Sequence, residues 1–166
     1  ASDAALAQKG TTDTYYLHGL VRMAQRDYRT AETDLERVIE WNYLYEDAYV
    51  ALAEVQLKLY EQYTGPTMQL RTLDKAVERT TTALELNPRS TAALFTRSKA
   101  FALQKEYAKA IDDISKVIAN GRTDAEVYRQ RARYYNGYGQ QQNAVNDLNR
   151  VLQEQPKDVN ALLLRA

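Results

Sequence analysis

Alanines recur in this chain at a fixed period. Ala76, Ala110 and Ala144 stand 34 residues apart, and the apolar residues Ile114 and Leu148 follow the last two at one common offset. A period of this length is typical of a chain built from stacked copies of one small unit, because such a unit buries too little apolar surface to fold alone. The sequence therefore predicts an array of repeats.

Residues 125–158 show what one copy contains. A first stripe has helical spacing and consists of Tyr128, Arg131, Ala132 and Tyr135. The segment Asn-Gly-Tyr-Gly at 136–139 is predicted to break that helix, since glycine tolerates the left-handed geometry of a tight reversal. A second helix follows from Ala144, and Pro156 ends it because proline has no N–H to donate. Each copy is thus predicted to be a helix–turn–helix unit.

These residues resemble the tetratricopeptide repeat, a helix–turn–helix unit of 34 residues. The position that the family keeps small carries Gly19, Ala53, Ser98 and Ala132. The position that the family keeps as alanine carries Ala31, Ala76, Ala110 and Ala144. No copy has tryptophan at the opening aromatic position, and only two copies end on the family's proline, Pro88 and Pro156.

The resemblance implies an all-α fold, a right-handed α-solenoid of about four full repeats in a single domain. The predicted repeats are 12–45, 46–90, 91–124 and 125–158, with partial units at 1–11 and 159–166. Residues Ser2–Lys9 are predicted to end the second helix of an earlier repeat. Both termini are therefore expected to be cut from a longer array.

The second repeat is longer than the others. Ala53 and Ala76 are 23 residues apart, whereas the matching Gly19 and Ala31 are 12 apart, an insertion of 11. Apolar residues continue through the inserted stretch on both sides of a turn at residues 65–66. The pattern predicts that both helices of this repeat are lengthened by five or six residues.

Composition excludes several classes of function. Lys plus Arg and Asp plus Glu both number 22, which argues against the broad basic surface of a nucleic-acid-binding protein. The chain has no cysteine, so it has no disulfide, thiolate nucleophile or cysteine-based zinc site. No apolar run approaches the roughly 18 residues that a membrane span needs, which predicts no membrane insertion. The compartment stays open between cytoplasmic and extracytoplasmic.

The residues that could carry catalysis do not form a recognisable set. His18 is the only histidine and lies on a helix face that packs against other helices, so it is interpreted as a satisfied packing residue. Asp112 and Asp113 are interpreted as a solvated face, because adjacent helical residues point apart. No phosphate-binding or dinucleotide motif occurs. The sequence predicts a non-catalytic protein with no cofactor and no metal site.

The family resemblance places binding on the first helix of each repeat, which lines the concave groove in that family. Transferred to this chain, the predicted partner-binding residues are Tyr16, Leu20, Val50, Phe95, Lys99, Arg129 and Arg133. The N-terminal half of this set is apolar with acidic neighbours and the C-terminal half is basic, which favours a protein or peptide partner with an apolar end and an acidic end. For Arg129 and Arg133 the alternative is a merely solvated helix face. The lysine and asparagine residues of the family's chaperone-binding carboxylate clamps are absent, so chaperone tails are not expected as partners.

Two further hypotheses concern other surfaces. The lengthened second hairpin offers a second candidate surface made of Tyr60, Tyr63, Met68 and Leu70. The alternative there is a longer hairpin that binds nothing. A rival to peptide binding is a structural role in which the terminal repeats form a homo-oligomer, favoured by Leu162, Leu163 and Leu164 if they are exposed.

Overall fold

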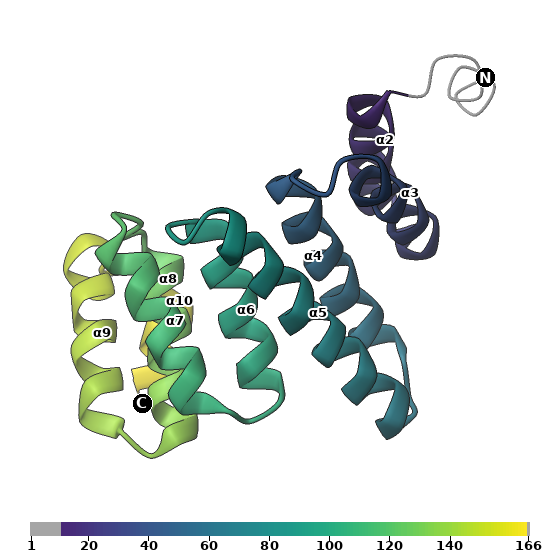
Figure 1. Cartoon of the computed structure of the whole chain (residues 1–166). Helices are drawn as coiled ribbons and strands as arrows, with labels where there is room; N and C mark the ends of the chain where they lie inside the picture. The colour runs from purple at the N-terminus through teal and green to yellow at the C-terminus, as the bar shows by residue number, and fades with distance from the viewer. Residues whose placement is uncertain (1–10, 166) are drawn as a thin grey trace. The chain divides into compact units, whose positions relative to one another are not determined.

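The computed structural model describes residues 11–165, and this range consists of nine α-helices joined by short turns, without a β-strand (Figure 1). In chain order the helices are α2 (Thr12–Ala24), α3 (Tyr28–Trp41), α4 (Glu46–Gln62), α5 (Pro66–Leu86), α6 (Thr91–Leu103), α7 (Tyr107–Ala119), α8 (Ala125–Tyr138), α9 (Gln141–Glu154) and α10 (Val159–Arg165). The all-α prediction is confirmed. The helix end predicted at Ser2–Lys9 lies outside the described residues.

The helices form two compact units, Ala1–Pro88 (unit 1) and Arg89–Ala166 (unit 2). In unit 1, α2 pairs with α3 and α4 with α5, and the two hairpins meet where α3 packs on α4. In unit 2, α6 pairs with α7 and α8 with α9, α7 packs on α8, and α10 packs against α8 and α9. Each unit therefore stacks helix hairpins in sequence order.

The hairpin turns use a left-handed residue at one repeating position. Arg26 and Lys105 both have a φ of 63°, and Gly139 has a φ of 83°. Only glycine adopts this conformation without steric cost, since a side chain crowds the following carbonyl. The position is thus fixed by geometry in three hairpins, and two of them hold a strained residue there.

The predicted break at residues 136–139 is wrong in its extent, because α8 continues through Tyr138 and only Gly139 makes the turn. Gly137 is helical and has a different role. A Cβ atom added to it would lie 2.5 Å from Cε1 of Tyr107, so the absent side chain makes room for that ring. The two glycines of one short motif therefore serve packing and chain reversal separately.

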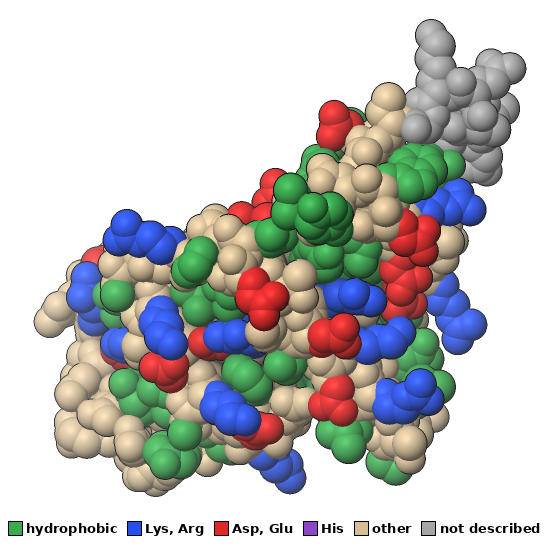
Figure 2. Space-filling view, in the orientation of Figure 1, with side chains coloured by type: hydrophobic (Ala, Val, Ile, Leu, Met, Phe, Trp, Pro, Cys, Tyr) green, Lys and Arg blue, Asp and Glu red, His purple; other side chains and the backbone are tan. Residues whose placement is uncertain are grey.

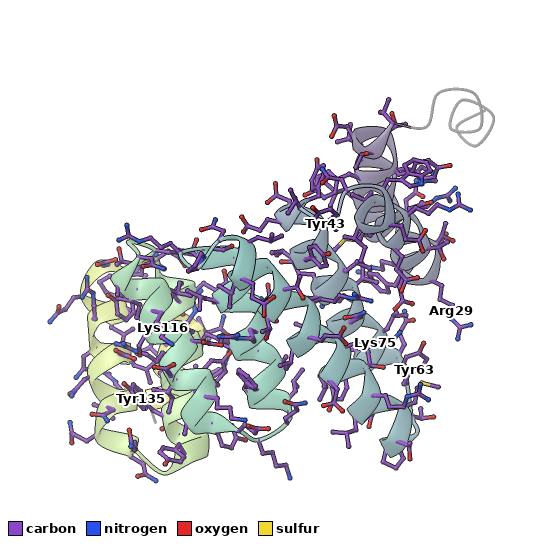
Figure 3. All side chains as sticks on the ribbon, in the orientation of Figure 1. Arg29, Tyr43, Tyr63, Lys75, Lys116 and Tyr135 are labelled. Carbon is purple, nitrogen blue, oxygen red and sulfur yellow. The ribbon has the colours of Figure 1, made fainter. Side chains whose placement is uncertain are left out.

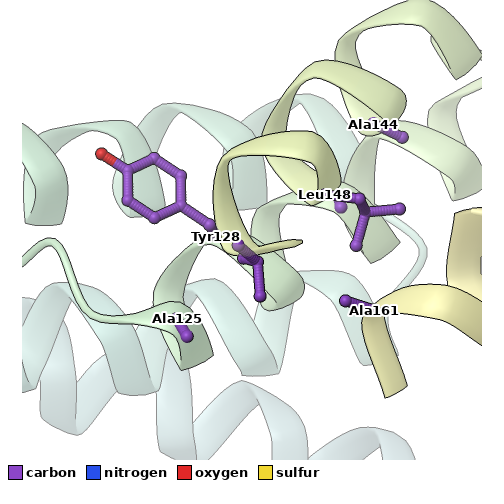
Figure 4. Close-up of a cluster of buried hydrophobic side chains, with 7 residues drawn as sticks. Ala125, Tyr128, Ala144, Leu148 and Ala161 are labelled. Carbon is purple, nitrogen blue, oxygen red and sulfur yellow. The ribbon is translucent and has the colours of Figure 1, made fainter. Parts of the chain in front are cut away.

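Small residues bring the two helices of each hairpin together. The repeat alanines and the small positions are buried, and a Cβ atom on Gly19 would lie 2.8 Å from Cγ of Leu35. In unit 2 a buried cluster joins α8, α9 and α10 around Tyr128, Leu148 and Ala161 (Figure 4). Close helix packing in a thin array thus depends on the small residues that the period reveals.

Both helices of the second hairpin are lengthened, as predicted. Helix α4 has 17 residues and α5 has 21, whereas the helices of the other complete hairpins have 13 or 14. The predicted equal share of five or six residues each is wrong, because α5 takes most of the insertion. Pro66 explains the asymmetry, since proline is favoured at the first position of a helix and starts α5 early.

A buried acid on the second helix binds a base on the first helix in three hairpins. The pairs are His18 with Asp34, Arg97 with Asp113 and Arg131 with Asp147. The two arginines bind their partners through two hydrogen bonds of 2.7 and 2.8 Å each, the fork geometry that makes such pairs strong. These pairs set the rotation of each first helix on its second helix.

The pairs confirm one interpretation and correct another. His18 is satisfied within its hairpin, with its Nδ1 atom 2.5 Å from Oδ2 of Asp34. Asp112 is on the solvated face and binds Lys116, but Asp113 is only 2% exposed, so its assignment to that face is wrong.

The second hairpin has Leu52 and Arg79 at the positions that the other hairpins use for this ion pair. Within residues 11–165, Nε of Arg79 and both amide atoms of Gln56 are buried without a hydrogen-bond partner. A buried polar group without a partner costs stability, since it loses its bonds to water. The lengthened hairpin therefore carries a polar defect that its neighbours lack.

Candidate partner-binding surfaces

Charged side chains of both signs are interspersed over the face shown in Figure 2, without one large field of a single sign. This agrees with the equal numbers of acidic and basic residues in the chain. Within residues 11–165 no cluster of three or more His, Cys, Asp or Glu side chains could hold a metal ion. No helix in that range is both long and apolar enough to span a bilayer. A candidate partner-binding site is therefore expected on a local surface of individual helices.

The predicted groove residues of unit 1 lie on a surface rich in tyrosine and acid. The ring centroids of Tyr16 on α2 and Tyr45, the residue before α4, are 5.0 Å apart. The Tyr45 hydroxyl donates a hydrogen bond of 3.3 Å to Oδ1 of Asp13. Burial raises the pKa of the Tyr16 hydroxyl, and the charges of Asp47 and Glu54 raise it further. We call Tyr16, Tyr45 and Leu20, with the acids Asp13, Asp47 and Glu54 around them, the unit 1 surface. It presents hydroxyls and carboxylates around aromatic rings.

Two of the predicted residues in unit 1 are less accessible than the sequence suggested. Val50 is 7% exposed and Leu20 is partly buried against the core of the α2–α4 helices. They form the floor of the unit 1 surface and leave the ring of Tyr16, with the nearby acids, for a partner to touch.

The predicted residues of unit 2 lie on α6 and α8. Phe95 is 5% exposed, and Nζ of Lys99 and the guanidinium of Arg122 each lie 4.2 Å from its ring centroid. Cations over an aromatic face are held by the negative face of the ring. Phe95 therefore positions two cations and is itself covered by them.

Arg129 and Arg133 differ in their availability. Arg129 forms an ion pair with Asp158, whose carboxylate also accepts a hydrogen bond of 2.9 Å from the backbone N–H of Ala161. These interactions, the backbone N–H first, lower the pKa of the Asp158 carboxyl. Arg129 thereby stabilises the start of α10, and its side chain is only 21% exposed. Arg133 is exposed and donates to Oε1 of Gln130 over 2.8 Å.

A polar network that the sequence did not reveal supports Arg133. Gln130 donates to the Tyr134 hydroxyl over 3.2 Å, and that hydroxyl lies 3.3 Å from the Ser98 hydroxyl on α6. Burial raises the pKa of the Tyr134 hydroxyl, which therefore stays protonated. Since tyrosine at this place follows no motif, only the packing of α8 on the neighbouring helices could identify it. We call Lys99, the Phe95 ring beneath it and Arg133 the unit 2 surface.

The second candidate surface is divided by the structure. Tyr63 and Met68 line a common pocket of about 130 Å³, and Figure 3 shows Tyr63 and Lys75 at the same end of unit 1. Met68 and Leu70 are 47% and 56% exposed, whereas Tyr60 is partly buried. Tyr60 and Leu70 do not line the pocket. The structure therefore brings together two of the four predicted residues.

The stacked helix hairpins define the class of this protein as an α-helical repeat protein. A family model described as "Tetratricopeptide repeat" matches residues 16–60 and 68–125, which is more than half of the chain. The chain belongs to the tetratricopeptide repeat family. The gap between the two matched segments lies in the lengthened hairpin, where the chain departs from the family's period.

Solved structures support the same fold. A thermophilic repeat protein from Thermus thermophilus matches with 20% identity and a TM-score of 0.81 over 98% of this chain and 84% of that one. MamA matches with 19% identity and a TM-score of 0.80 over 95% and 86% of the respective chains. PilF of Pseudomonas aeruginosa matches with 16% identity and a TM-score of 0.75 over 99% and 70%. A sequence search of curated proteins found no match.

At these identities the likeness extends to the fold alone. The family as a whole consists of scaffolds for protein–protein interaction, and this general role is the one that membership supports for the chain. The identity of a partner must come from the surfaces of this chain.

Proposed function

We propose that this chain is a non-catalytic interaction module whose first helices bind an extended segment of a partner protein. The observation that carries the proposal is the unit 2 surface, where Lys99 of α6 lies over the buried ring of Phe95 and Arg133 of α8 is exposed. An ammonium and a guanidinium both favour carboxylates, and the guanidinium can hold one through two hydrogen bonds. The unit 2 surface thus suits an acidic segment.

The unit 1 surface suits a different part of a partner. Tyr16 and Tyr45 offer aromatic faces and hydroxyls, and Asp13 and Asp47 make the surroundings acidic. Tyrosine gives a large contact area at low cost in conformational entropy, because its side chain has few rotatable bonds. An apolar segment without negative charge fits this surface. A partner with an apolar part and an acidic part therefore agrees with both surfaces.

The proposal is tested with a fluorescein-labelled acidic peptide that contains one leucine, by fluorescence anisotropy. The variant Lys99→Glu/Arg133→Glu reverses both cations of the unit 2 surface and is expected to weaken binding about tenfold, or about 1.4 kcal/mol. The control Lys109→Glu/Lys116→Glu makes the same charge change on α7, a second helix, and is expected to keep the affinity. Equal losses in both variants would mean that net charge and not the first-helix surface governs binding.

Arg129 is left unchanged in this test. Its guanidinium pairs with Asp158 at the start of α10, so a charge reversal there would disturb the folding of α10 as well as any binding.

A second candidate function is self-association through the outer face of α2. Leu17 and Val21 on this face are 60% and 51% exposed, whereas the matching residues of α4, Ala51 and Val55, are buried in the core that α3 and α4 share. An apolar face that another hairpin would bury is a site where a second copy of the chain could pack.

Light scattering over a concentration series tests self-association, with Leu17→Glu as the variant. Self-association predicts a mass that rises with concentration in the wild type and stays at the monomer in the variant. A monomer at all concentrations would exclude this function. At the other terminus Leu162 and Leu163 are 41% and 71% exposed, whereas Leu164 is partly buried against the α8–α10 core, so two of the three leucines meet the condition of exposure.

A further inference from the structure

The lengthened hairpin forms a pocket with α3 that the family's standard repeat length would not produce. The pocket is lined by Glu32 of α3, Leu59 of α4, Tyr63 in the turn, and four residues of α5, namely Met68, Arg71, Thr72 and Lys75. Most of this lining comes from the residues that the insertion adds. The pocket is therefore a property of this chain and lies apart from the first-helix surfaces of the proposed function.

The tip of the hairpin is held in place by its own hydrogen bonds. Nε2 of Gln69 donates to the backbone carbonyl of Tyr63 over 2.7 Å, and the Thr72 hydroxyl donates to the carbonyl of Met68 over 2.7 Å. Pro66 begins α5 and restricts the turn before it. The Tyr63 ring also packs on the core around Leu59. A pocket with a fixed wall is preorganised, so little ordering cost arises when it is filled.

The pocket has an apolar floor and a basic rim. Leu59, Tyr63 and Met68 supply the apolar side chains, and Arg71 and Lys75 stand one turn apart on α5. In the described part of the chain, residues 11–165, Arg71 forms no hydrogen bond or ion pair and is exposed. A solvated guanidinium beside an apolar pocket is ready to bind an incoming carboxylate.

One acid, Glu32, also lines the pocket. Oε1 of Glu32 lies 3.8 Å from Nζ of Lys75, and the two side chains are 23% and 48% exposed. An ion pair this long and this exposed is weak, because water screens it. A carboxylate from a ligand can therefore replace Glu32 beside Lys75 while Arg71 supplies a second cation.

The volume sets the size of what the pocket can take. It is about 130 Å³, close to the cavity of roughly 150 Å³ that holds one benzene molecule in an engineered protein. One leucine or phenylalanine side chain is of that size. A larger apolar group would have to stay outside.

We propose that this hairpin pocket binds a peptide segment in which one leucine or phenylalanine side chain is flanked by carboxylates. The apolar side chain occupies the space between Tyr63 and Met68, and the flanking carboxylates pair with Arg71 and Lys75. The hairpin pocket is thus a second docking site for an acidic segment that bears a leucine. It consists of other residues than the unit 1 and unit 2 surfaces. It does not depend on binding at the unit 2 surface.

The chain provides its own reporter for this site, because it has only two methionines, Met23 and Met68. Met68 lines the pocket and is 47% exposed, whereas Met23 is partly buried at the core of unit 1. In a sample with ¹³C-methyl methionine, titration with the peptide Asp-Glu-Leu-Asp-Glu up to about 1 mM is expected to move the Met68 signal more than the Met23 signal. The substitution Met68→Leu assigns the two signals.

Matched variants separate the contributions. All are made in the Lys99→Glu/Arg133→Glu background, so that the unit 2 surface does not contribute to the fluorescence anisotropy. Met68→Ser is expected to weaken binding severalfold, and Leu70→Ser, a truncation of a similarly exposed side chain in the same turn but outside the pocket, is expected to leave the affinity unchanged. Arg71→Glu/Lys75→Glu is expected to weaken it at least tenfold. A peptide with serine in place of leucine is expected to lose the Met68 shift.

Three results would overturn the proposal. They are a Met68 signal that stays in place, equal affinities of the Met68→Ser and Leu70→Ser variants, or equal binding of the leucine and serine peptides. Failure here is distinct from failure of the proposed function, because Lys99→Glu/Arg133→Glu is expected to keep the Met68 shift. Circular dichroism of each variant confirms that the helices are intact.

Discussion

The ion pair between Arg97 and Asp113 gives the sharpest test of how the hairpins are held together. Asp113 is 2% exposed and accepts two hydrogen bonds of 2.7 and 2.8 Å, whereas the Arg97 side chain is 18% exposed. This difference predicts unequal costs for removing the two partners. Arg97→Met leaves a carboxylate buried without a partner and is expected to cost about 3 to 5 kcal/mol of the free energy of unfolding.

Asp113→Leu is expected to cost less, about 1 to 3 kcal/mol. The guanidinium of Arg97 is partly exposed and its long side chain can turn its charge towards water. The double variant Arg97→Met/Asp113→Leu replaces the pair with apolar groups and is expected to lie within about 1 kcal/mol of the wild type. The coupling energy is then about the sum of the two single costs, roughly 4 to 8 kcal/mol.

Urea unfolding followed by circular dichroism at neutral pH measures all four proteins of this cycle. The neighbouring pair of Lys116 and Asp112 is a matched control, since its partners are 53% and 64% exposed, and its removal is expected to cost less than about 1 kcal/mol with little coupling. Additive costs at Arg97 and Asp113, or a larger cost for Asp113→Leu than for Arg97→Met, would refute the reasoning. A changed slope of the transition would show that unfolding had ceased to be a single step.

Three other substitutions test packing, strain and capping, and one tests the polar defect, each by the same unfolding assay. Gly19→Ala is expected to cost about 1 to 3 kcal/mol although alanine favours helices, because its Cβ would meet the fully buried Leu35 at 2.8 Å; an unchanged stability would contradict this. Lys105→Gly is expected to add about 1 kcal/mol by removing a side chain from a φ of 63°, and a loss would mean that the strain is absent. Gln56→Leu is expected to add about 1 to 2 kcal/mol, since its buried amide has no partner within residues 11–165; a destabilised variant would indicate a partner. Asp124→Ala is expected to cost about 1 kcal/mol at neutral pH, because the carboxylate caps α8. Burial raises the pKa of the Asp124 carboxyl, but hydrogen bonds from the Arg122 side chain and from two backbone N–H groups outweigh it, so the pKa is lowered in the folded state. The stability that this carboxylate contributes is therefore present above its unfolded pKa of about 3.9 and is lost as the pH falls through the lower folded pKa. A cost of Asp124→Ala that persists in acid would be inconsistent with this.

The period of the sequence was enough to predict the helices, because small residues must recur where helices touch. The burial of Ala110 and Ala144 and the close contact of Gly19 with Leu35 follow from that period. The same logic predicted lengthened helices in the second hairpin. It could not divide the insertion between them, since the division depends on where Pro66 starts α5.

Polar residues inside the hairpins were harder to interpret. Asp112 and Asp113 are adjacent and identical in type, yet one is solvated and the other is buried in an ion pair. The distinction lies in the facing helix, where an arginine stands at the position opposite Asp113. Three pairs at one repeating offset, including His18 with Asp34, are a signal that a search for paired charges across a hairpin would have found.

The candidate surfaces were predicted only in outline. Repeat position indicates which residues lie on a first helix, but it does not show that Phe95 is covered by two cations or that Arg129 fastens α10. Such details depend on neighbours that are distant in sequence. The binding role of these residues stays a prediction.

The most direct test of the central claim, that the first helices bind the partner, is amide chemical-shift mapping with the acidic leucine peptide. The account predicts that shifts in unit 2 gather on α6 and α8 around Lys99 and Arg133, spare α7 and α9, and disappear in the Lys99→Glu/Arg133→Glu variant. Shifts concentrated on α7 and α9, or a pattern unchanged in that variant, would contradict it.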